Sequence, residues 1–404
     1  MTEALVMAKR PGLLVLTSTY PRWAGDPEPG FVHELARRLI DRFDVCVIGP
    51  HASGALAQEE LDGVLVHRYR YAPVRLETLV NNGGMLGNVK RAPWKWLLIP
   101  GFLLGQYCAL RKAIRRFQPQ VVHVHWMLPQ GLVAAIALRN VPWIVTSHGA
   151  DLFGLRGRWF ARLRGWVTGH ASMMTVVSEA MRVRLLSESP GLGVAVLPMG
   201  VDTTTRFTPG VIRRNDGEML FVGRLVEKKG VHHLLHAMPA VLAKHPQATL
   251  TIVGFGPELN PLQELVQRLS LQKHVNFVGA LSQDELAQYY QRASLFVAPF
   301  IEASGGDQEG LGLVVAEAMA CGCPVVVGDV PAVRDLVDAE TGVRVVAADH
   351  AALAEAIVIL LDDGKERARL SAAGRRYVEQ HYSWDVVSDR YAELLHSVAG
   401  APKP

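Results

Sequence analysis

The amino-acid sequence predicts an α/β protein in which two doubly wound parallel sheets follow one another along the chain. Short apolar runs rich in β-branched residues alternate with helical patterns over almost the whole length, which is typical of parallel sheets covered by helices on both faces. The alternation is interrupted at 198–215 by a segment rich in proline, glycine and threonine, and we place a domain boundary there. With 404 residues, the chain is long enough to bury two separate cores.

Seven strands are predicted before this boundary, each from a short apolar run. The clearest helix between them is 31–43, where Phe31, Leu35, Leu39 and Phe43 recur at helical spacing opposite charged residues. In chain order the strands are 13–17, 45–49, 64–69, 121–125, 144–147, 173–177 and 194–197.

Six further strands are predicted after the boundary, and a last helical stretch, 383–398, follows once the second sheet is complete. In open parallel sheets, ligands bind beyond the carboxyl ends of the strands. We therefore expect the functional residues in the loops that follow strands, beside a cleft between the two domains. The predicted strands of the second domain are 219–222, 249–253, 275–278, 295–298, 324–327 and 343–345.

Charge and cysteine content restrict the function. The 42 basic and 38 acidic side chains give a net charge of +4, which is too even for a protein that mainly coats nucleic acid. Four cysteines cannot form a disulfide scaffold in a chain of this length, and residues 1–10 contain no apolar secretory segment. The longest apolar stretch, 96–110, is shorter than a bilayer span. We expect a cytoplasmic protein without a nucleic-acid partner.

The most informative segment is 309–327, where a glycine-rich turn leads into a helix. Gly310 and Gly312 allow backbone amides to approach a ligand closely, and the helix N-terminus adds partial positive charge, so this turn favours a phosphate. Glu309 and Glu317 would repel a phosphate, and they are better suited to accept hydrogen bonds from sugar hydroxyls. The alternative is that Glu309 only caps the helix and Glu317 only faces solvent.

A second loop, 221–230, follows a strand and also opens a helix. Lys229 opposes the helix dipole there, which makes more sense if an anion shares the position. Arg224, which follows Gly223, offers a planar guanidinium that can bind two phosphate oxygens. The two cations would offset most of the charge of a nucleotide diphosphate. The alternative is an exposed loop with solvated charges.

Three further loops contain candidate residues. His148 lies at the end of a first-domain strand, although a lone histidine is more often structural. Gly30 precedes a helix whose N-terminus would hold an anion on backbone amides, or else it belongs to a plain surface turn. Gly254 follows a strand of the second domain, but Pro257 and Leu259 break the glycine fingerprint of dinucleotide-binding proteins.

Metal binding is not favoured by the sequence. His123 and His125 are two residues apart on one strand and therefore on one face, but no third ligand occurs at a recognisable spacing. The chain also has no Asp-x-Asp pair to hold a divalent cation on a nucleotide sugar. We expect no metal or other cofactor, with Arg224 and Lys229 as the partners of the phosphates.

Taken together, these residues resemble the retaining, two-lobed GT-B glycosyltransferases of the "glycosyl transferases group 1" kind, which are similar to glycosyltransferase family 4. The most specific likeness is the Glu-x7-Glu element formed by Glu309 and Glu317. Two positions depart from the family pattern, since Met199 stands where asparagine is frequent and Leu311 where phenylalanine is common. The remaining matching residues are Gly223, Arg224, Lys229, Gly310, Gly312, Gly322 and Pro324.

The resemblance implies a GT-B fold of two Rossmann-like domains with a cleft between them. Residues 1–205 would bind the acceptor and residues 206–382 the nucleotide-diphospho-sugar, while a terminal helix, 383–404, would cross back to the first domain.

The resemblance also implies roles for individual residues. Arg224 and Lys229 would neutralise the diphosphate, and Glu317 would bind the ribose. Glu309 would hold the donor sugar, and His148 would contact it near the reacting carbon. The other donor-binding positions that the resemblance implies are Gly30, Gly223, Gly254, Gly310, Leu311, Gly312, Leu313 and Val314.

The expected reaction is retaining, metal-independent transfer of a hexosyl unit to a glycan or lipid-linked acceptor. The donor would be GDP-mannose or a UDP-sugar, and the loop 305–309 resembles that of some mannosyltransferases. The basic and aromatic region 90–116 suits contact with the inner face of an anionic membrane, or else it is a packed helix with ordinary flanking charges. A nucleotide-sugar epimerase and a non-catalytic nucleotide-sugar-binding protein are the alternative functions.

Overall fold

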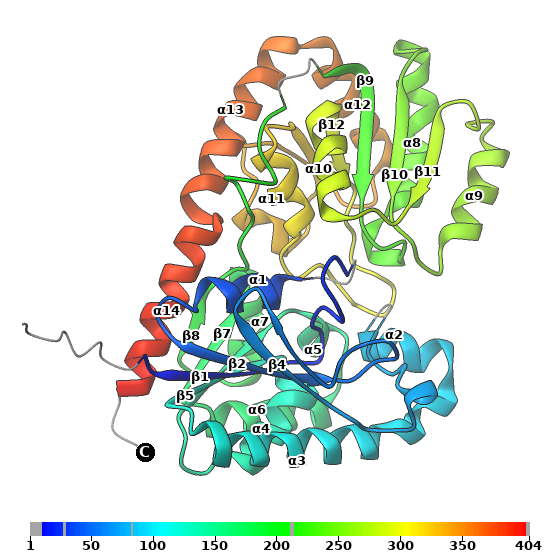
Figure 1. Cartoon of the computed structure of the whole chain (residues 1–404). Helices are drawn as coiled ribbons and strands as arrows, with labels where there is room; N and C mark the ends of the chain where they lie inside the picture. The colour runs from blue at the N-terminus through cyan, green and yellow to red at the C-terminus, as the bar shows by residue number, and fades with distance from the viewer. Residues whose placement is uncertain (1–9, 27–29, 82–83, 211–213, 401–404) are drawn as a thin grey trace, which may run out of the picture.

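The computed structural model describes residues 10–26, 30–81, 84–210 and 214–400 and shows two α/β lobes, one above the other (Figure 1). The outer parts of the predicted domains, 1–9 and 401–404, lie outside the described residues, as does 27–29 in the loop before Gly30. Each lobe has one sheet with helices on both faces, and the sheets are connected by the segment around 198–214.

The first sheet has the strand order β3-β4-β2-β1-β5-β6-β7-β8, and only β3 runs antiparallel to its neighbour. Every residue of its central strands β1 and β5 is buried, and Val15 of β1 lies between Val47 and His123 of the flanking strands. The strands are β1 (Gly12–Leu16), β2 (Asp44–Pro50), β3 (Gln58–Leu61), β4 (Val64–Tyr69), β5 (Val121–His125), β6 (Trp143–Ser147), β7 (Met173–Val176) and β8 (Val194–Val196).

The second sheet has the order β11-β10-β9-β12-β13-β14, and all its pairings are parallel. Because the first strand of each lobe lies in the middle of its sheet, the strand order reverses there, and ligand crevices form at such reversals. The strands are β9 (Asn215–Val222), β10 (Thr249–Val253), β11 (Val275–Gly279), β12 (Ala293–Ala298), β13 (Val325–Gly328) and β14 (Val343–Val345).

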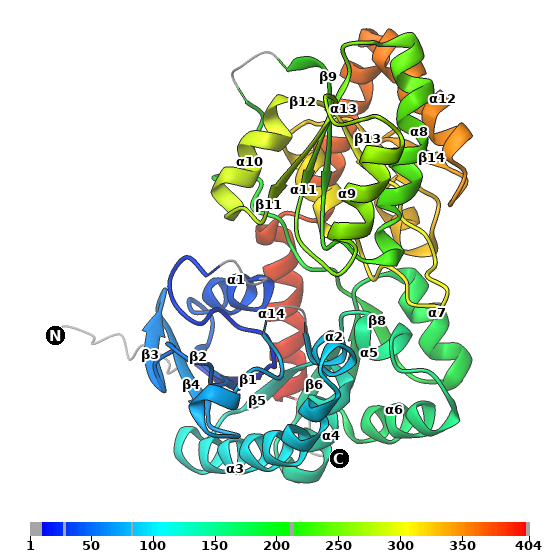
Figure 2. The ribbon, with the colours of Figure 1, turned by 90° about the vertical axis from the view of Figure 1, so that its right-hand side faces the viewer.

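Helices cover both sheets, as Figure 2 shows from the side. In the first lobe they are α1 (Phe31–Arg38), α2 (Gly84–Arg91), α3 (Ile99–Phe117), α4 (Leu132–Ala137), α5 (Ala150–Phe153), α6 (Arg158–His170) and α7 (Glu179–Glu188). In the second they are α8 (Val231–Lys244), α9 (Leu259–Arg268), α10 (Gln283–Arg292), α11 (Leu313–Ala320), α12 (His350–Asp362) and α13 (Gly364–His381), followed by α14 (Trp384–Gly400).

Two local predictions were incomplete. The helix predicted at 31–43 ends at Arg38, because the amide of Leu39 bonds to the carbonyl of Ala36 and the chain tightens into a turn. Leu39 and Phe43 are still buried, so the apolar spacing continues through the turn and imitates a longer helix. The polar edge strand β3 was not predicted, since its sequence QEEL lacks an apolar run.

The terminal helix α14 crosses back to the first lobe (Figure 1), which confirms the predicted fold class. At the crossing, the amide of Val201 bonds to the carbonyl of Tyr382 at 2.7 Å, and the amide of Trp384 bonds back to Val201 at 3.1 Å. Further along α14, the Tyr391 hydroxyl donates to the carbonyl of Leu197 at 3.0 Å. Within the described ranges, no helix is both long enough and apolar enough to cross a membrane.

Candidate active site

Loops from the two lobes touch at residues without side chains. A Cβ atom built on Gly310 would lie 2.7 Å from the carbonyl oxygen of His148, and one built on Gly149 would lie 3.1 Å from the Cα of Gly310. Beside this contact, Arg156 of the first lobe pairs with Glu302 of the second at 3.5 Å. The predicted elements 146–151 and 309–317 therefore meet across one cleft, and glycine is what allows their backbones to come so close.

An ion pair joins the two predicted loops of the second lobe. Lys229 Nζ lies 2.6 Å from Glu309 Oε2, with side chains 12% and 15% exposed, and it also lies 4.5 Å from the centre of the Phe300 ring. Burial would raise the pKa of Glu309, but Lys229 and the neighbouring Lys228 outweigh it and lower the pKa to about 2. Lys228 in turn donates to Asp307 Oδ1 at 3.2 Å, which fixes the start of the glutamate loop.

Gly223 lies against the side chain of Lys229 and directly precedes Arg224 in the chain. A Cβ on Gly223 would lie 3.5 Å from Cε of Lys229. Gly254 of the adjacent loop has a φ of 139°, and a Cβ there would lie 1.9 Å from the carbonyl oxygen of Gly223, so only glycine fits. Arg224 reaches toward the first lobe, where its Nη2 would lie 3.6 Å from a Cβ on Gly87 of α2. The structure thus gives Gly254 a packing role, and its predicted donor-binding role stays a prediction.

The N-terminus of α11 faces the same region. Gly312 caps this helix in the left-handed conformation, with a φ of 80°, and the amides of Leu313 and Val314 belong to its first turn. The side chain of Leu311 is buried. Amides at such a terminus attract anions.

Tyr290 of α10 positions the carboxylate of Glu317. The hydroxyl of this completely buried tyrosine donates to Glu317 Oε2 at 3.0 Å, and among the described residues no hydrogen bond reaches Oε1. Burial raises the pKa of Glu317 to about 7, against the opposing effect of the Tyr290 hydrogen bond. Glu317 is thus a half-buried carboxylate with one oxygen positioned and the other available to a ligand, rather than a solvated surface group.

His148 lies in an aromatic enclosure in the first lobe. Its Nε2 is 2.9 Å from Nδ1 of His125, and its ring centre is 4.9 Å from that of Phe31 and 4.8 Å from that of Trp126. Gly30 caps α1 directly before Phe31, so the α1 N-terminus lies beside His148. Burial, together with the nearby His123, lowers the pKa of His148 to about 3, and the imidazole is therefore neutral at physiological pH.

Asp151 connects the strands that carry this enclosure. It accepts hydrogen bonds from the amide of Met127, after β5, at 2.6 Å and from the hydroxyl of Ser147, at the end of β6, at 2.7 Å. Trp126, directly before Met127, has a φ of 70°, a conformation that costs an aromatic residue energy and is found mainly at functional sites.

The histidine pair on β5 is used within the protein. His123 Nε2 lies 2.7 Å from the hydroxyl of Thr146, and the rings of His123 and His125 are 4.1 Å apart in the core. Across the described ranges, no three His, Cys, Asp or Glu side chains are grouped so that they could hold a metal ion.

Sequence reasoning missed three of these residues. His125 was considered only as a metal ligand, and its contact with His148 depends on β5 and β6 being neighbours. Tyr290 bonds to Glu317, and Lys228 bonds to the loop that contains Glu309. Each acts from another element, at least 27 residues away in the sequence. The position of Lys228 directly before Lys229 could have indicated its role in the site. Nothing in the helical pattern around Tyr290 distinguishes it from a structural residue.

Two protein families match the two lobes. The family described as "Glycosyl transferases group 1" matches residues 202–377, and "Glycosyltransferase Family 4" matches residues 31–205.

Three relatives illustrate the range of similar proteins. A GDP-mannose-dependent monoacylated alpha-(1-6)-phosphatidylinositol monomannoside mannosyltransferase of Corynebacterium glutamicum is 36% identical over 50% of this chain and 55% of its own length, so the match spans about half of that relative. A glycogen synthase of Mycobacterium tuberculosis is 29% identical over 69% of each chain. A phosphatidyl-myo-inositol mannosyltransferase of Mycolicibacterium smegmatis is 33% identical over 72% of this chain and 75% of its own.

The fold is also found in a solved structure. A sucrose-phosphate synthase of Thermosynechococcus elongatus superposes with a TM-score of 0.80, covering 97% of this chain and 100% of the other, at 22% identity. This likeness identifies the two-lobed GT-B arrangement.

The glycine contact across the cleft generates a first prediction. In Gly310→Ala the new methyl group would press on a backbone carbonyl of the other lobe, which cannot move without opening the cleft. We expect a loss of about 10²-fold in kcat/KM for glycosyl transfer, because small misplacements of reacting groups cost that much. The thermal midpoint should stay close to that of the parent, since each lobe is intact. Gly305→Ala in the same loop has no neighbour within 4 Å and is the matched control. Full activity of Gly310→Ala would contradict this account.

The raised pKa of Glu317 generates a second prediction, on the expectation that its carboxylate accepts hydrogen bonds from the ribose. Above pH 7 the group is ionised and can accept them; below pH 7 it is protonated, so nucleotide affinity should fall by up to about tenfold per pH unit. Glu309 and His148, with pKa values of about 2 and 3, do not titrate between pH 5.5 and 8.5. Calorimetric nucleotide titrations across this range measure the effect, and Glu317→Gln should flatten it. A parent affinity that does not vary with pH would refute the assignment.

Proposed function

The chain belongs to the glycosyl transferases group 1 family of GT-B glycosyltransferases, and from this premise we propose that it is a retaining hexosyltransferase. In this proposal it moves a hexosyl unit from a nucleotide-diphospho-sugar to a glycan or lipid-linked acceptor without a metal ion. The observation that carries the proposal is the convergence of Lys229, Glu309 and the loop of Arg224 at one side of the cleft. Two cations beside a helix N-terminus form a site for a pyrophosphate.

The Lys229–Glu309 pair supports separate roles for its two members. When a diphosphate enters, Lys229 and Arg224 bind its oxygens. The ionised Glu309 then accepts hydrogen bonds from hydroxyls of the donor sugar. Charge builds on the departing diphosphate as the sugar–phosphate bond breaks, and cations placed there stabilise the transition state more than the ground state.

The neutral His148 fits a role in holding the donor sugar. Its imidazole has a pKa of about 3, and it is therefore suited to hydrogen-bond the donor sugar near the reacting carbon rather than to donate a proton. In this proposal the carboxylate of Glu309 is occupied by hydroxyls of the donor sugar. We accordingly favour front-face attack assisted by the leaving diphosphate, with no covalent sugar–enzyme intermediate.

GDP-mannose is the donor that we propose. The loop 305–309 resembles that of some mannosyltransferases, and two of the three relatives described above are named mannosyltransferases. The glycogen synthase among them is the reason to test other donors in parallel.

We propose that the first lobe contacts an anionic membrane. In the 3-10 turn Pro93–Leu98 the side chains of Trp94, Trp96 and Leu97 are 49%, 60% and 81% exposed. The next helix, α3, bears a basic group of side chains around a surface hollow. Exposed aromatic and apolar residues beside cations are the features by which proteins adsorb to membrane interfaces. The basic members of this group are Arg111, Lys112, Arg115 and Arg116.

The donor proposal is tested by offering GDP-mannose, UDP-glucose and ADP-glucose with an excess of EDTA. We expect turnover of GDP-mannose that EDTA does not reduce, and a product in which NMR finds the anomeric configuration of the donor. Inversion, or an absolute need for a divalent cation, would overturn the corresponding part of the proposal.

The same assay tests the cations. Arg224→Ala and Lys229→Ala should each lose about 10²-fold or more in kcat, as when one donor to a transition-state oxyanion is removed. Lys244→Ala, an exposed lysine at the other end of α8, is the control and should keep full turnover. Near-normal turnover in both cleft variants would refute the assignment.

The membrane proposal is tested by co-sedimentation with vesicles of phosphatidylcholine and phosphatidylglycerol. Binding should fall as salt is raised, and Leu97→Ser should weaken it at least threefold, because an apolar side chain no longer enters the interface. The control is Ile359→Ser, which removes a side chain 55% exposed on the other lobe. Equal binding by the two variants would remove the proposal.

A further inference from the structure

The aromatic enclosure of His148 contains a hydrogen bond between two histidine rings. Nε2 of His148 lies 2.9 Å from Nδ1 of His125, the last residue of β5. The two ring planes are 16° apart and the ring centres are 5.2 Å apart, so the rings meet edge to edge and nearly in one plane. The N–H of one ring then points at the lone pair of the other, which is the favoured geometry of a hydrogen bond.

Neither ring is charged in this contact. Burial lowers the pKa of His125 well below its ordinary value, and the neighbouring His123 and His148 add to the effect. The pKa of His148 is about 3. Each neutral imidazole has a proton on only one of its two nitrogens. A single proton therefore lies between the rings, and the ring that owns it determines whether the other nitrogen of His148 donates or accepts.

A chain of hydroxyl groups fixes the proton of the next histidine, His123. Its Nε2 lies 2.7 Å from the hydroxyl of Thr146, which lies 2.6 Å from that of Thr175. The Thr175 hydroxyl donates to the carbonyl of Val145 at 3.5 Å. Because a carbonyl can only accept, each hydrogen in the chain points toward it, and His123 donates from Nε2. Its buried Nδ1, which has no partner among the described residues, is then an acceptor without a donor.

The same reasoning assigns the proton between His125 and His148. Within the described ranges no hydrogen bond reaches Nε2 of His125, and this residue is 1% exposed. If His125 accepted from His148, its own proton would lie on Nε2 and face no acceptor. Orphaned N–H groups are rarer in protein interiors than under-used acceptors, and His123 shows the same preference. His125 therefore donates from Nδ1 to Nε2 of His148.

His148 consequently has its proton on Nδ1. No described residue bonds to this nitrogen, and His148 is only half-buried, so Nδ1 is the nitrogen left for a ligand. The rings of Phe31 and Trp126 lie against the imidazole, with centres 4.9 and 4.8 Å away, and they hinder a flip that would exchange its nitrogens. The ring thus offers a ligand one N–H and no lone pair.

We propose that His125 is a positioning residue: by donating to Nε2 of His148, it keeps the proton of that ring on Nδ1 and makes His148 a hydrogen-bond donor to an oxygen of the bound sugar. The inference rests on the proposed glycosyltransferase function and adds the direction of this contact. The tautomer is set before the nucleotide sugar arrives, and a preorganised hydrogen-bond donor needs no rearrangement during the reaction.

The first test measures the tautomer in the full chain without ligand. Long-range proton–nitrogen NMR spectra of protein labelled with nitrogen-15 in its histidines distinguish protonated from unprotonated ring nitrogens, and the signals lost in His148→Gln identify His148. We expect Nδ1 protonated and Nε2 unprotonated. His125→Phe keeps a ring beside His123 but has no N–H, so the proton of His148 should move to Nε2 or divide between the two nitrogens.

A proton on Nε2 of His148 in the parent, or an unchanged tautomer in His125→Phe, would overturn the inference. The parent spectrum decides the tautomer even where His125→Phe does not fold.

The second test measures what this positioning does for glycosyl transfer. His125→Phe should lose about tenfold in kcat/KM, which corresponds to one hydrogen bond to the sugar. His125→Asn, whose amide can donate from the place of Nδ1, should recover most of this loss. His170→Asn removes an exposed histidine of the same lobe and is the control, with activity like the parent.

Equal losses in the two His125 variants would indicate a packing role and overturn the positioning role. A parent chain that transfers no hexosyl unit would instead reject the proposed function, and the tautomer of His148 would still be read from the spectra.

Discussion

The ion pair between Lys229 and Glu309 determines how the cleft is organised. It is enclosed enough for burial to penalise an unpaired charge, and each member therefore needs the other in the absence of a ligand. The pair fixes the loop that contains Glu309 against the loop after β9. Gly310, the next residue of the Glu309 loop, contacts the first lobe. In the proposed reaction, an entering anion would release the glutamate for hydrogen bonds to the donor sugar, so that the resting contact is exchanged for substrate contacts.

The fold was largely predictable because parallel sheets leave a clear pattern in the sequence. Buried strands such as Leu13–Leu16 or Val325–Val327 are continuous apolar runs, and the sequence separates them by helical patterns. The edge strand Gln58–Leu61 gave no such signal, since one exposed side allows polar residues. The end of α1 was missed because a turn can keep apolar residues at helical spacing.

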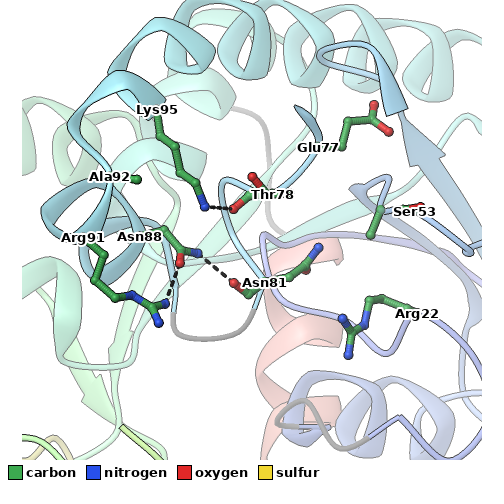
Figure 3. A pocket seen from close by; sticks show the side chains of 10 residues that line it. Arg22, Ser53, Glu77, Thr78, Asn81, Asn88, Arg91, Ala92 and Lys95 are labelled. Carbon is green, nitrogen blue, oxygen red and sulfur yellow. Dashed lines mark hydrogen bonds between the residues drawn. The ribbon is translucent and has the colours of Figure 1, made fainter. Parts of the chain in front are cut away.

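The candidate site was predictable where residues are neighbours in the chain. Glycines beside charged residues at strand ends marked the loops of Arg224 and Glu309, which the structure brings together. The contacts of Tyr290 with Glu317 and of His125 with His148 could not be predicted, because they depend on which helices and strands become neighbours. A pocket in the first lobe is lined by residues as far apart in the sequence as Arg22 and Lys95 (Figure 3), and no local pattern encodes such a space.

The paired crossings near Val201 and Ser383 have a mechanical consequence. Because both passages of the chain between the lobes lie side by side and share backbone hydrogen bonds, they act as one hinge rather than as two independent tethers. Rotation about this hinge leaves each sheet whole and separates the glycine contact across the cleft. An opening of the cleft that keeps these hydrogen bonds would therefore be a rotation of one lobe about this crossing, and its reversal would return the glycine backbones to the same contact.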